Sequence, residues 1–473
     1  MLFNSLHFIV FFVAVYALYR ALDFRWQNRL LLVASYYFYA AWDWRFLGLL
    51  LLSTVVDFIC AIQIQKSNEE RRRRLFLWLS VGSNLSVLGF FKYYNFFADS
   101  IQTLAQSAGF TLDDLTLNII LPMGISFYTF QTLSYTIDVY RRRLEPTRNI
   151  WDFALYISFF PQLVAGPIER AMQLLPQLTQ ARVISRDQVA DGLWLIFYGF
   201  FLKVFVADNL SKIVDVGFST DAPVSGDMAL ISTYAFVFQI FGDFAGYSSI
   251  AIGLGKLMGF ELMTNFRFPY FVTNPSDFWR NWHISLSSWL RDYLYIPLGG
   301  NRGTTFMHYR NLFLTMLLGG LWHGAAWTFV IWGAFQGSVL ILHRLVEPYL
   351  AKLHPNSRAG KRTWWVVRVV VMFHITCIGW LIFRAQSAQQ IADMLVAIAT
   401  MSDFSATALY YAGQLAFYSG LLILIQVVQM RRNDLLAIIR LSMLPRVALL
   451  TSMFFLAAAF GEYGGQTFIY FQF

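Results

Sequence analysis

Two histidines lie in apolar, tryptophan-rich segments of this chain. His283 occurs in DFWRNWHISLSSWLRDYLYIPLGG and His323 in LWHGAAWTFVIW. A neutral imidazole, with an ordinary pKa of about 6.5, can accept the proton of a hydroxyl as that hydroxyl attacks an acyl carbon. A second ring, or a nearby Asn or Trp N–H group, can polarise the carbonyl or stabilise the oxyanion. The pair therefore fits direct acyl transfer to a hydroxyl without a nucleophilic Ser or Cys.

Other interpretations of the two histidines stay open at this point. An interfacial helix with its Trp residues among lipid headgroups would make His283 a surface ring. His323 fits a core histidine bonded to a backbone carbonyl. The chain has no HExxH or HxH spacing near the pair, and Cys60 and Cys377 both fall in apolar segments, so we expect neither a metal site nor a disulfide. It also lacks a GxSxG elbow, a Walker loop and a dinucleotide fingerprint, which disfavours serine hydrolases and nucleotide-driven pumps.

The composition is that of a polytopic membrane protein. The 473 residues are 57% hydrophobic and 18% aromatic but only 13% charged, with a mean hydropathy of +0.51. A membrane-spanning helix takes about 20 apolar residues. We therefore expect an all-α protein with roughly eleven to thirteen transmembrane and re-entrant helices. A titratable ring at bilayer depth is costly, which makes each histidine a candidate functional residue.

The net charge of +9 does not indicate nucleic-acid binding. The basic residues occur in short groups between apolar segments, which is the pattern of cytoplasmic loops. These groups are Arg20, Arg25 and Arg29; Lys66 and Arg71 to Arg74; Arg141 to Arg143 and Arg148; Arg182 and Arg186; Lys361 and Arg362; and Arg431 and Arg432. Residues 98–118 carry three aspartates and no Lys or Arg, and residues 208–227 carry four aspartates against Lys212. We expect the basic loops to be cytoplasmic and these two acidic segments to be external loops, and we expect a retained first helix with an external N-terminus.

Apolar segments fill most of the chain, which we interpret as one integral membrane domain. It comprises N-terminal helices (1–115), a core with the chemical motifs (116–345) and C-terminal helices (346–473). The expected spans are 6–22, 30–42, 46–64, 75–97, 117–140, 190–207, 228–259, the long run 311–343, 364–384, 410–430 and 446–462. Residues 151–167 are short and broken by Pro161, Gly166 and Pro167, so we expect a re-entrant segment there.

Residues 274–300 are too polar to span and predict one amphipathic helix. Asn274 is a suitable cap, Pro275 suits the first turn, and Pro297 with the following glycines ends the helix. At 3.6 residues per turn, one face holds Trp279, Trp282, Leu286, Trp289, Leu290 and Tyr293, and the other holds Arg280, Asn281, Ser285, Ser287, Ser288, Arg291 and Asp292. His283 falls at the border between these faces.

Six segments, in order along the chain, resemble one known family. They are LPMGISFYTFQTLSYTIDVYRR (121–142), FFPQLVAGPIER (159–170), DFAGYSSIAIGLGKLMGF (243–260), DFWRNWHISLSSWLRDYLYIPLGGNRG (277–303), GGLWHGAAWTFVIWGAFQG (319–337) and the tail FIYFQF. The chain thus resembles the membrane-bound O-acyltransferases (MBOAT), in particular the bacterial branch with the alginate O-acetyltransferase membrane subunit and the teichoic-acid D-alanyl transfer protein.

The resemblance implies a fold, a reaction and roles for residues. The fold would be a helix bundle around a central channel with a thin floor, through which an acyl group passes from a cytoplasmic donor to an external acceptor. His323 corresponds to the family's catalytic histidine, and His283 to a second histidine facing the same channel. Further substrate-binding candidates are Arg280, Trp282, Arg291, Asp292, Tyr295 and Trp322. No bound cofactor is implied, and acetyl-CoA is the expected donor.

The expected function is an inner-membrane acyltransferase of a bacterium, which lies among membrane lipids and O-acetylates an extracytoplasmic polysaccharide such as alginate, directly or through a partner protein. The sequence departs from the family pattern at Ala245, Ser249 and Arg267, which leaves the donor or acceptor open. A transporter or lipid-linked sugar flippase would share broken helices and polar groups near the membrane midplane. A non-catalytic subunit of an export complex would not depend on either histidine.

Overall fold

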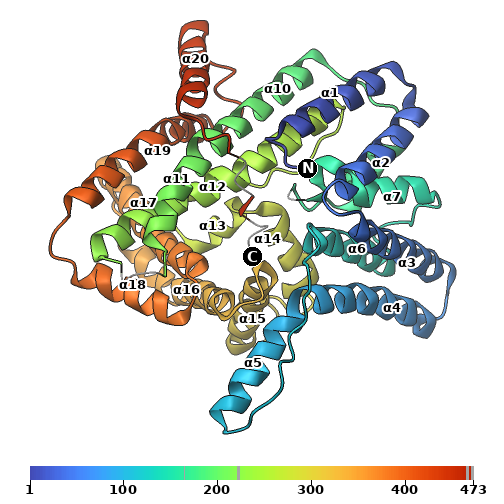
Figure 1. Ribbon diagram of the computed structural model, residues 1–473, viewed down its shortest axis with the longest axis horizontal. Coiled ribbons are helices and arrows are strands. Elements are labelled where there is room, and N and C mark those ends of the chain that lie inside the picture. The colour runs from blue at the N-terminus through green and yellow to red at the C-terminus, as the bar shows by residue number, and fades with distance from the viewer. Residues whose placement is uncertain (165, 221–223, 465–467, 470–473) are drawn as a thin grey trace. The chain divides into compact units, whose positions relative to one another are not determined.

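The protein is helical, as expected from the composition. The computed structural model describes residues 1–164, 166–220, 224–464 and 468–469, and within these ranges the chain forms helices and connecting segments without a β-strand (Figure 1). Cys60 and Cys377 are both buried and unpaired with each other, as predicted. The chain divides into two compact units, Met1–Gly192 with Ala251–Met263, and Leu193–Ile250 with Thr264–Phe473.

The first unit consists of the N-terminal helices. They are α1 (Leu6–Ala21), α2 (Phe24–Ala40), η1 (Trp44–Phe46), α3 (Leu47–Lys66), α4 (Glu70–Leu88), the π-helical turn η2 (Gly89–Tyr93), α5 (Tyr94–Ser107), α6 (Ile125–Tyr140), α7 (Ile150–Ser158), α8 (Phe160–Leu163) and α9 (Ala171–Thr179). Helices α3, α4 and α6 pack against one another. Their interface contains Asp57, which accepts hydrogen bonds from Ser80 (2.5 Å) and Asn84 (3.0 and 2.9 Å). A polar network thus joins helices that apolar contacts alone would leave less specifically paired.

The second unit carries both histidines. Its helices are the π-helix η3 (Phe201–Ala207), α11 (Asp208–Gly217), η4 (Pro269–Phe271), α13 (Pro275–Asn281), α14 (Ile284–Leu290), the π-helical turn η5 (Arg291–Tyr295), α15 (Thr305–His323), α16 (Trp327–Lys352), α17 (Arg358–Arg384), α18 (Ala388–Thr400), α19 (Ala406–Arg432) and α20 (Met443–Phe460). The unit boundaries fall within α10 (Arg186–Phe200) and α12 (Gly226–Leu257).

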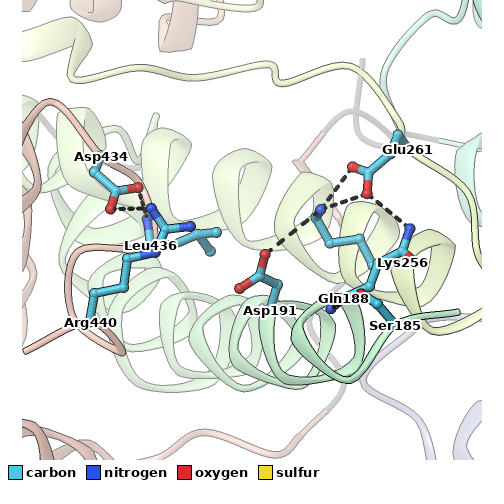
Figure 2. A network of polar contacts seen from close by, with 8 residues as sticks. All are labelled: Ser185, Gln188, Asp191, Lys256, Glu261, Asp434, Leu436 and Arg440. Atoms are coloured by element: carbon cyan, nitrogen blue, oxygen red, sulfur yellow. Dashed lines mark hydrogen bonds and ion pairs between the residues drawn. The ribbon is translucent and has the colours of Figure 1, made fainter.

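Polar networks fix some of the helix ends within each unit. In the first unit, Lys256 donates to both carboxylate oxygens of Glu261 at 2.9 and 2.8 Å and lies 4.0 Å from Asp191 (Figure 2). In the second unit, Arg440 pairs with Asp434 at 2.8 Å (Figure 2). Lys256 lies in the last turn of α12, where a positive charge offsets the helix dipole.

Eight helices among the described residues are long and apolar enough to cross a membrane. They lie within Trp44–Lys66, Glu70–Ser107, Arg186–Gly217, Gly226–Leu257, Trp327–Lys352, Arg358–Arg384, Ala406–Arg432 and Met443–Phe460, and α1 is a shorter apolar helix. The run 311–343, which is too long for one crossing, is divided between α15 and α16. The expectation of a polytopic helical membrane protein is confirmed.

Three local predictions need correction. The span expected at 117–140 becomes helical only from Ile125, because Pro122 interrupts it and Gly124 takes a left-handed conformation with φ of +73°. The segment expected as an external loop at 208–227 begins as helix α11, and its Asp208 is buried. Asp221 of that segment lies outside the described residues. Helices α9 and α18 were not expected at all.

Candidate functional site

The segment predicted as one helix over 274–300 is broken at His283. Asn274 caps α13 as expected by accepting the Asp277 N–H at 2.8 Å, and Pro275 occupies its first position. The helix ends at Asn281, and α14 starts again at Ile284. His283 between them adopts a left-handed conformation with φ of 43°, which is uncommon for a residue other than glycine. The two-face prediction for a continuous helix is therefore wrong, and His283 is fully buried instead of lying at a face border.

Asn265 holds the break around His283 in place. The Ile284 N–H donates to the Asn265 backbone carbonyl at 2.9 Å, and the Ser285 hydroxyl donates to Asn265 Oδ1 at 2.7 Å. The same Oδ1 lies 3.4 Å from His283 Nδ1, and Asn265 Nδ2 donates to Ser248 Oγ at 3.0 Å. An amide oxygen can only accept, so this contact places the proton on Nδ1 of a neutral ring and the lone pair on Nε2.

Close helix packing places His323 at the end of α15. A Cβ added to Gly320 would lie 2.3 Å from the Phe329 carbonyl oxygen, and one added to Gly333 would lie 2.6 Å from that of Met316. Only glycine permits this close crossing of α15 and α16. His323 is the last residue of α15, and the next residue, Gly324, would clash with the Phe329 ring if it had a side chain. The glycines around His323 thus bring the two helices together and set the position of the ring.

Aromatic rings surround both imidazoles. The His283 ring lies 4.6 Å from the Phe244 ring, edge to face, and 6.1 Å from that of Trp322. The His323 ring lies 5.0 Å from Trp322, 5.1 Å from Trp332 and 5.4 Å from Phe383, all edge to face. Trp322 therefore contacts both histidines. The sequence pattern had placed these residues in two separate segments, and the structure joins them at one indole ring.

Burial also determines the charge of His283. Removal from water lowers the pKa of His283 to about 3 from its ordinary 6.5, because an imidazolium loses its hydration in such surroundings. His283 is therefore neutral at physiological pH, which is the form that can accept a proton or a hydrogen bond. His323 is only 5% exposed. The site thus holds two buried imidazoles, and His283 is in the neutral form that can accept a hydrogen bond.

The structure brings two of the six other predicted residues to the histidines. Trp282 is 1% exposed and precedes His283, and Trp322 contacts both rings. The remaining four make polar contacts away from the rings. Arg280 pairs with Asp277 at 2.9 Å, Arg291 pairs with Asp292 at 2.7 Å, and Tyr295 donates to Asn301 at 2.6 Å. Their proposed role in substrate binding stays a prediction.

Sequence reasoning missed Asn265 and also a buried ion cluster. Lys203 lies 2.8 Å from Asp208 and 2.8 Å from Asp243, and all three side chains are at most 7% exposed. Lys203 lies on η3, Asp208 on α11 and Asp243 on α12, so the cluster joins three elements. A lysine within an apolar stretch was the available signal for a buried partner.

The described part of the C-terminal tail packs near the same cluster. The Ile469 N–H donates to Asp243 Oδ2 at 2.6 Å, and the Phe468 ring lies 4.8 Å from the Tyr247 ring and 5.8 Å from the Phe244 ring. Residues 470–473 of the FIYFQF motif lie outside the described residues. Across the described ranges, no group of three or more His, Cys, Asp or Glu side chains is placed to hold a metal ion.

Comparison with known proteins agrees with this geometry. Residues 142–384, which include both histidines and Asn265, match the membrane-bound O-acyltransferase family, MBOAT. The chain is 43% identical over 408 residues to the probable alginate O-acetylase AlgI of Azotobacter vinelandii, covering 86% of this chain and 79% of that protein. It is 36% identical over 383 residues to the peptidoglycan O-acetyltransferase of Helicobacter pylori (76% and 71%), and 28% identical over 287 residues to the teichoic acid D-alanyltransferase of Bacillus subtilis (57% and 70%). This multi-pass membrane chain belongs to the membrane-bound O-acyltransferase family, and it is an O-acyltransferase.

Proposed function

We propose that this O-acyltransferase takes acetyl groups from cytoplasmic acetyl-CoA and delivers them for O-acetylation of an extracytoplasmic polysaccharide, with alginate as the first candidate. The acceptor hydroxyl belongs either to the polysaccharide or to a partner protein that passes the acetyl group on. We place the enzyme in the inner membrane of a bacterium. The observation that carries the proposal is the junction of two buried imidazoles, His283 and His323, at the single indole ring of Trp322.

In the proposed reaction, His323 is the general base. The acceptor hydroxyl oxygen attacks the thioester carbonyl carbon of acetyl-CoA while the imidazole takes the hydroxyl proton. A new C–O bond forms, the C–S bond breaks, and the proton passes from the imidazolium to the departing thiolate, which leaves as CoA–SH. His323 ends α15, where the partial negative charge of the helix C-terminus favours the transient imidazolium.

His283 has a different proposed role. With its proton held at Nδ1 towards Asn265, the neutral ring presents Nε2 as an acceptor and can orient the attacking hydroxyl. Its low pKa suits this role, because a ring that stays neutral does not compete with His323 for the transferred proton. Asn265 acts through His283 and is a positioning residue.

The names of the relatives and the charge of the basic loops support the proposed identity of the donor and the acceptor. Two of the three relatives named above, a probable alginate O-acetylase and a peptidoglycan O-acetyltransferase, are named for acetyl transfer, and the third is named for D-alanyl transfer to teichoic acid. The basic loops expected on the cytoplasmic side suit an anionic CoA donor. Alginate is the first candidate because the relatives with that name share up to 43% identity with this chain.

The test uses the purified full-length protein in lipid nanodiscs with radiolabelled acetyl-CoA. CoA release is followed with a thiol reagent, and label is followed on added alginate, peptidoglycan fragments or a co-expressed partner protein. We expect label on an acceptor and a loss of about 100- to 10,000-fold on His323→Ala, the usual contribution of a general base. His354→Ala, at an exposed histidine, is the matched control.

Two outcomes would overturn parts of this proposal. Wild-type acetyl transfer that persists in His323→Ala, with unchanged elution from a size-exclusion column, would remove the proposed base. Transfer of a longer acyl group but not of acetyl would keep the family reaction and replace the donor.

A further inference from the structure

A long apolar groove lies in the second unit, apart from the histidines. Its volume is about 440 Å³, and its walls come from α12, η4, α17 and α19. Phe241, Tyr270 and Phe373 supply aromatic surface. Helices α12, α17 and α19 are all among the candidate membrane spans. The groove is therefore bounded by helices that can cross a membrane, where the surrounding solvent is lipid.

The shape of the groove suits an extended chain that lies parallel to α19. One stripe of α19 lines it, comprising Ala412, Ala416, Ser419, Ile423 and Gln426. Residues spaced alternately three and four positions apart share one side of a helix. From Ala412 to Gln426 the rise is about 21 Å at 1.5 Å per residue. Small residues line one end of the stripe and Gln426 the other, so a narrow, mostly apolar channel runs beside α19 and parallel to it.

Positive charge lies at the Gln426 end of α19. Arg267 is exposed and lies two residues before the η4 turn, and its Nη2 donates to Asn433 Oδ1 at 2.8 Å. Asn433 caps α19 seven residues after Gln426, and the exposed Arg431 and Arg432 precede it. At the other end, residues 401–412 contain Asp403 and neither Lys nor Arg. An occupant with one apolar chain and an anionic head at the arginine end matches this polarity.

We propose that this groove binds an anionic phospholipid of the surrounding bilayer, with one acyl chain along α19 and the phosphate at Arg267. A lipid already lies parallel to the spanning helices, so binding costs little reorientation. One arginine close to a lipid phosphate contributes about 1 kcal/mol, which corresponds to about a fivefold preference for anionic lipid. The site is distinct from the histidine pair but adjoins it, because Phe241 and Tyr270 lie 6.4 and 6.0 Å from the ring of Trp282, the neighbour of His283.

Native mass spectrometry of the full-length protein tests the proposal. The protein is released from nanodiscs that contain equal amounts of phosphatidylglycerol and phosphatidylcholine with identical acyl chains, and retained lipid is counted as collision energy rises. We expect one tightly retained lipid, with phosphatidylglycerol preferred about fivefold. Arg267→Gln should abolish the preference but keep retention, whereas Arg358→Gln, at an exposed arginine that begins α17, should leave it unchanged.

A second variant tests the groove itself. Ala416→Trp should fill the channel and lower retention of both lipids about tenfold, because an indole leaves no room for the chain. Leu424→Trp is the matched control, since Leu424 is 52% exposed and does not line the groove. Equal lipid retention by the wild type and Ala416→Trp would overturn the groove as the lipid-binding site. Equal retention of the two lipids by the wild type would overturn the proposed preference for an anionic head group. Displacement of the lipid by palmitoyl-CoA would show that the groove binds an acyl donor instead.

Discussion

The second unit buries two polar centres that are built in opposite ways. The ion cluster holds the Lys203 ammonium between two carboxylates at 2.8 Å each, with the Ile469 N–H on one of them. The histidine centre orients His283 with one amide oxygen at 3.4 Å and packs it against the edge of Phe244. The ion pairs join η3, α11 and α12, so the cluster suits a structural role. The His283 ring is kept neutral by burial and is held by an amide and an aromatic edge, so it is in a form that can accept a hydrogen bond, which suits catalysis.

The largest expected effect separates activity from stability at the histidine centre. His283→Gln keeps a polar side chain of similar size but removes the imidazole, so acetyl transfer should fall about 100-fold or more while the melting temperature changes little. The assay is CoA release in nanodiscs, with the melting temperature from fluorescence-detected size exclusion. A large loss of stability with normal activity per folded molecule would show that His283 has a structural role and not a catalytic one.

The ion cluster should respond in the opposite way. Lys203→Met leaves Asp208 and Asp243 buried without their cation, so we expect a loss of about 3–5 kcal/mol and a melting temperature lower by roughly 10 °C. Lys212→Met is the control, because it removes only a solvent-accessible pair with Glu462. A similar melting temperature for both variants would show that burial does not distinguish the two lysines.

Asn265 should show a smaller and more specific effect. Asn265→Ala removes the acceptor at His283 Nδ1, and we expect acetyl transfer to fall about 10- to 100-fold, as for other residues that orient a functional imidazole. Asn265→Asp restores an acceptor but places a carboxylate beside the ring, which raises the pKa of His283 from its low value of about 3.

The pH profile then distinguishes positioning from a merely structural role. Wild-type His283 stays neutral down to about pH 4, so its protonation should not limit activity near pH 5.5. Activity of Asn265→Asp at that pH should drop relative to pH 7.5. An identical profile for wild type and Asn265→Asp would contradict a link between Asn265 and the ring.

The smallest effect concerns a third buried group, Glu169 in the first unit. Its Oε1 accepts the Met263 N–H at 2.6 Å, and burial raises the pKa of Glu169 to about 8 from 4.5. The folded state therefore holds a proton that the unfolded state releases above pH 4.5, so this stabilisation is full below pH 4.5 and is lost as pH rises through 8. The slope reaches at most about 1.4 kcal/mol per pH unit.

Glu169→Gln should remove this pH dependence, because an amide mimics the protonated acid at all pH values. The melting temperature between pH 6 and 9 should fall less in the variant than in the wild type. Glu261→Gln, at the exposed partner of Lys256 in Figure 2, should retain the wild-type slope. Parallel curves for Glu169→Gln and the wild type would refute a buried neutral acid.

Much of the fold could be predicted from local sequence. Apolar runs of sufficient length gave the spans, the Asn274 cap set the start of α13 correctly, and the glycines near His323 indicated an interrupted segment. The break at His283 could not be predicted in this way, because the Asn274 cap, Pro275 and the two-faced pattern that follows all favour a continuous helix. Asn265, eighteen residues earlier in the chain, overrides that local preference by bonding the Ile284 and Ser285 groups.

By itself, the sequence determined that this is a helical membrane protein with two histidines in segments that resemble those of acyltransferases. Hydropathy and motif spacing are local properties, so they can be identified without coordinates. Contacts between distant parts of the folded chain, in contrast, bring Trp322 to both histidines, hold Lys203 between two aspartates, and join Arg267 to Asn433 at the end of α19. These features depend on side chains far apart in sequence, whose contacts arise when close packing excludes solvent and fixes which polar groups must pair.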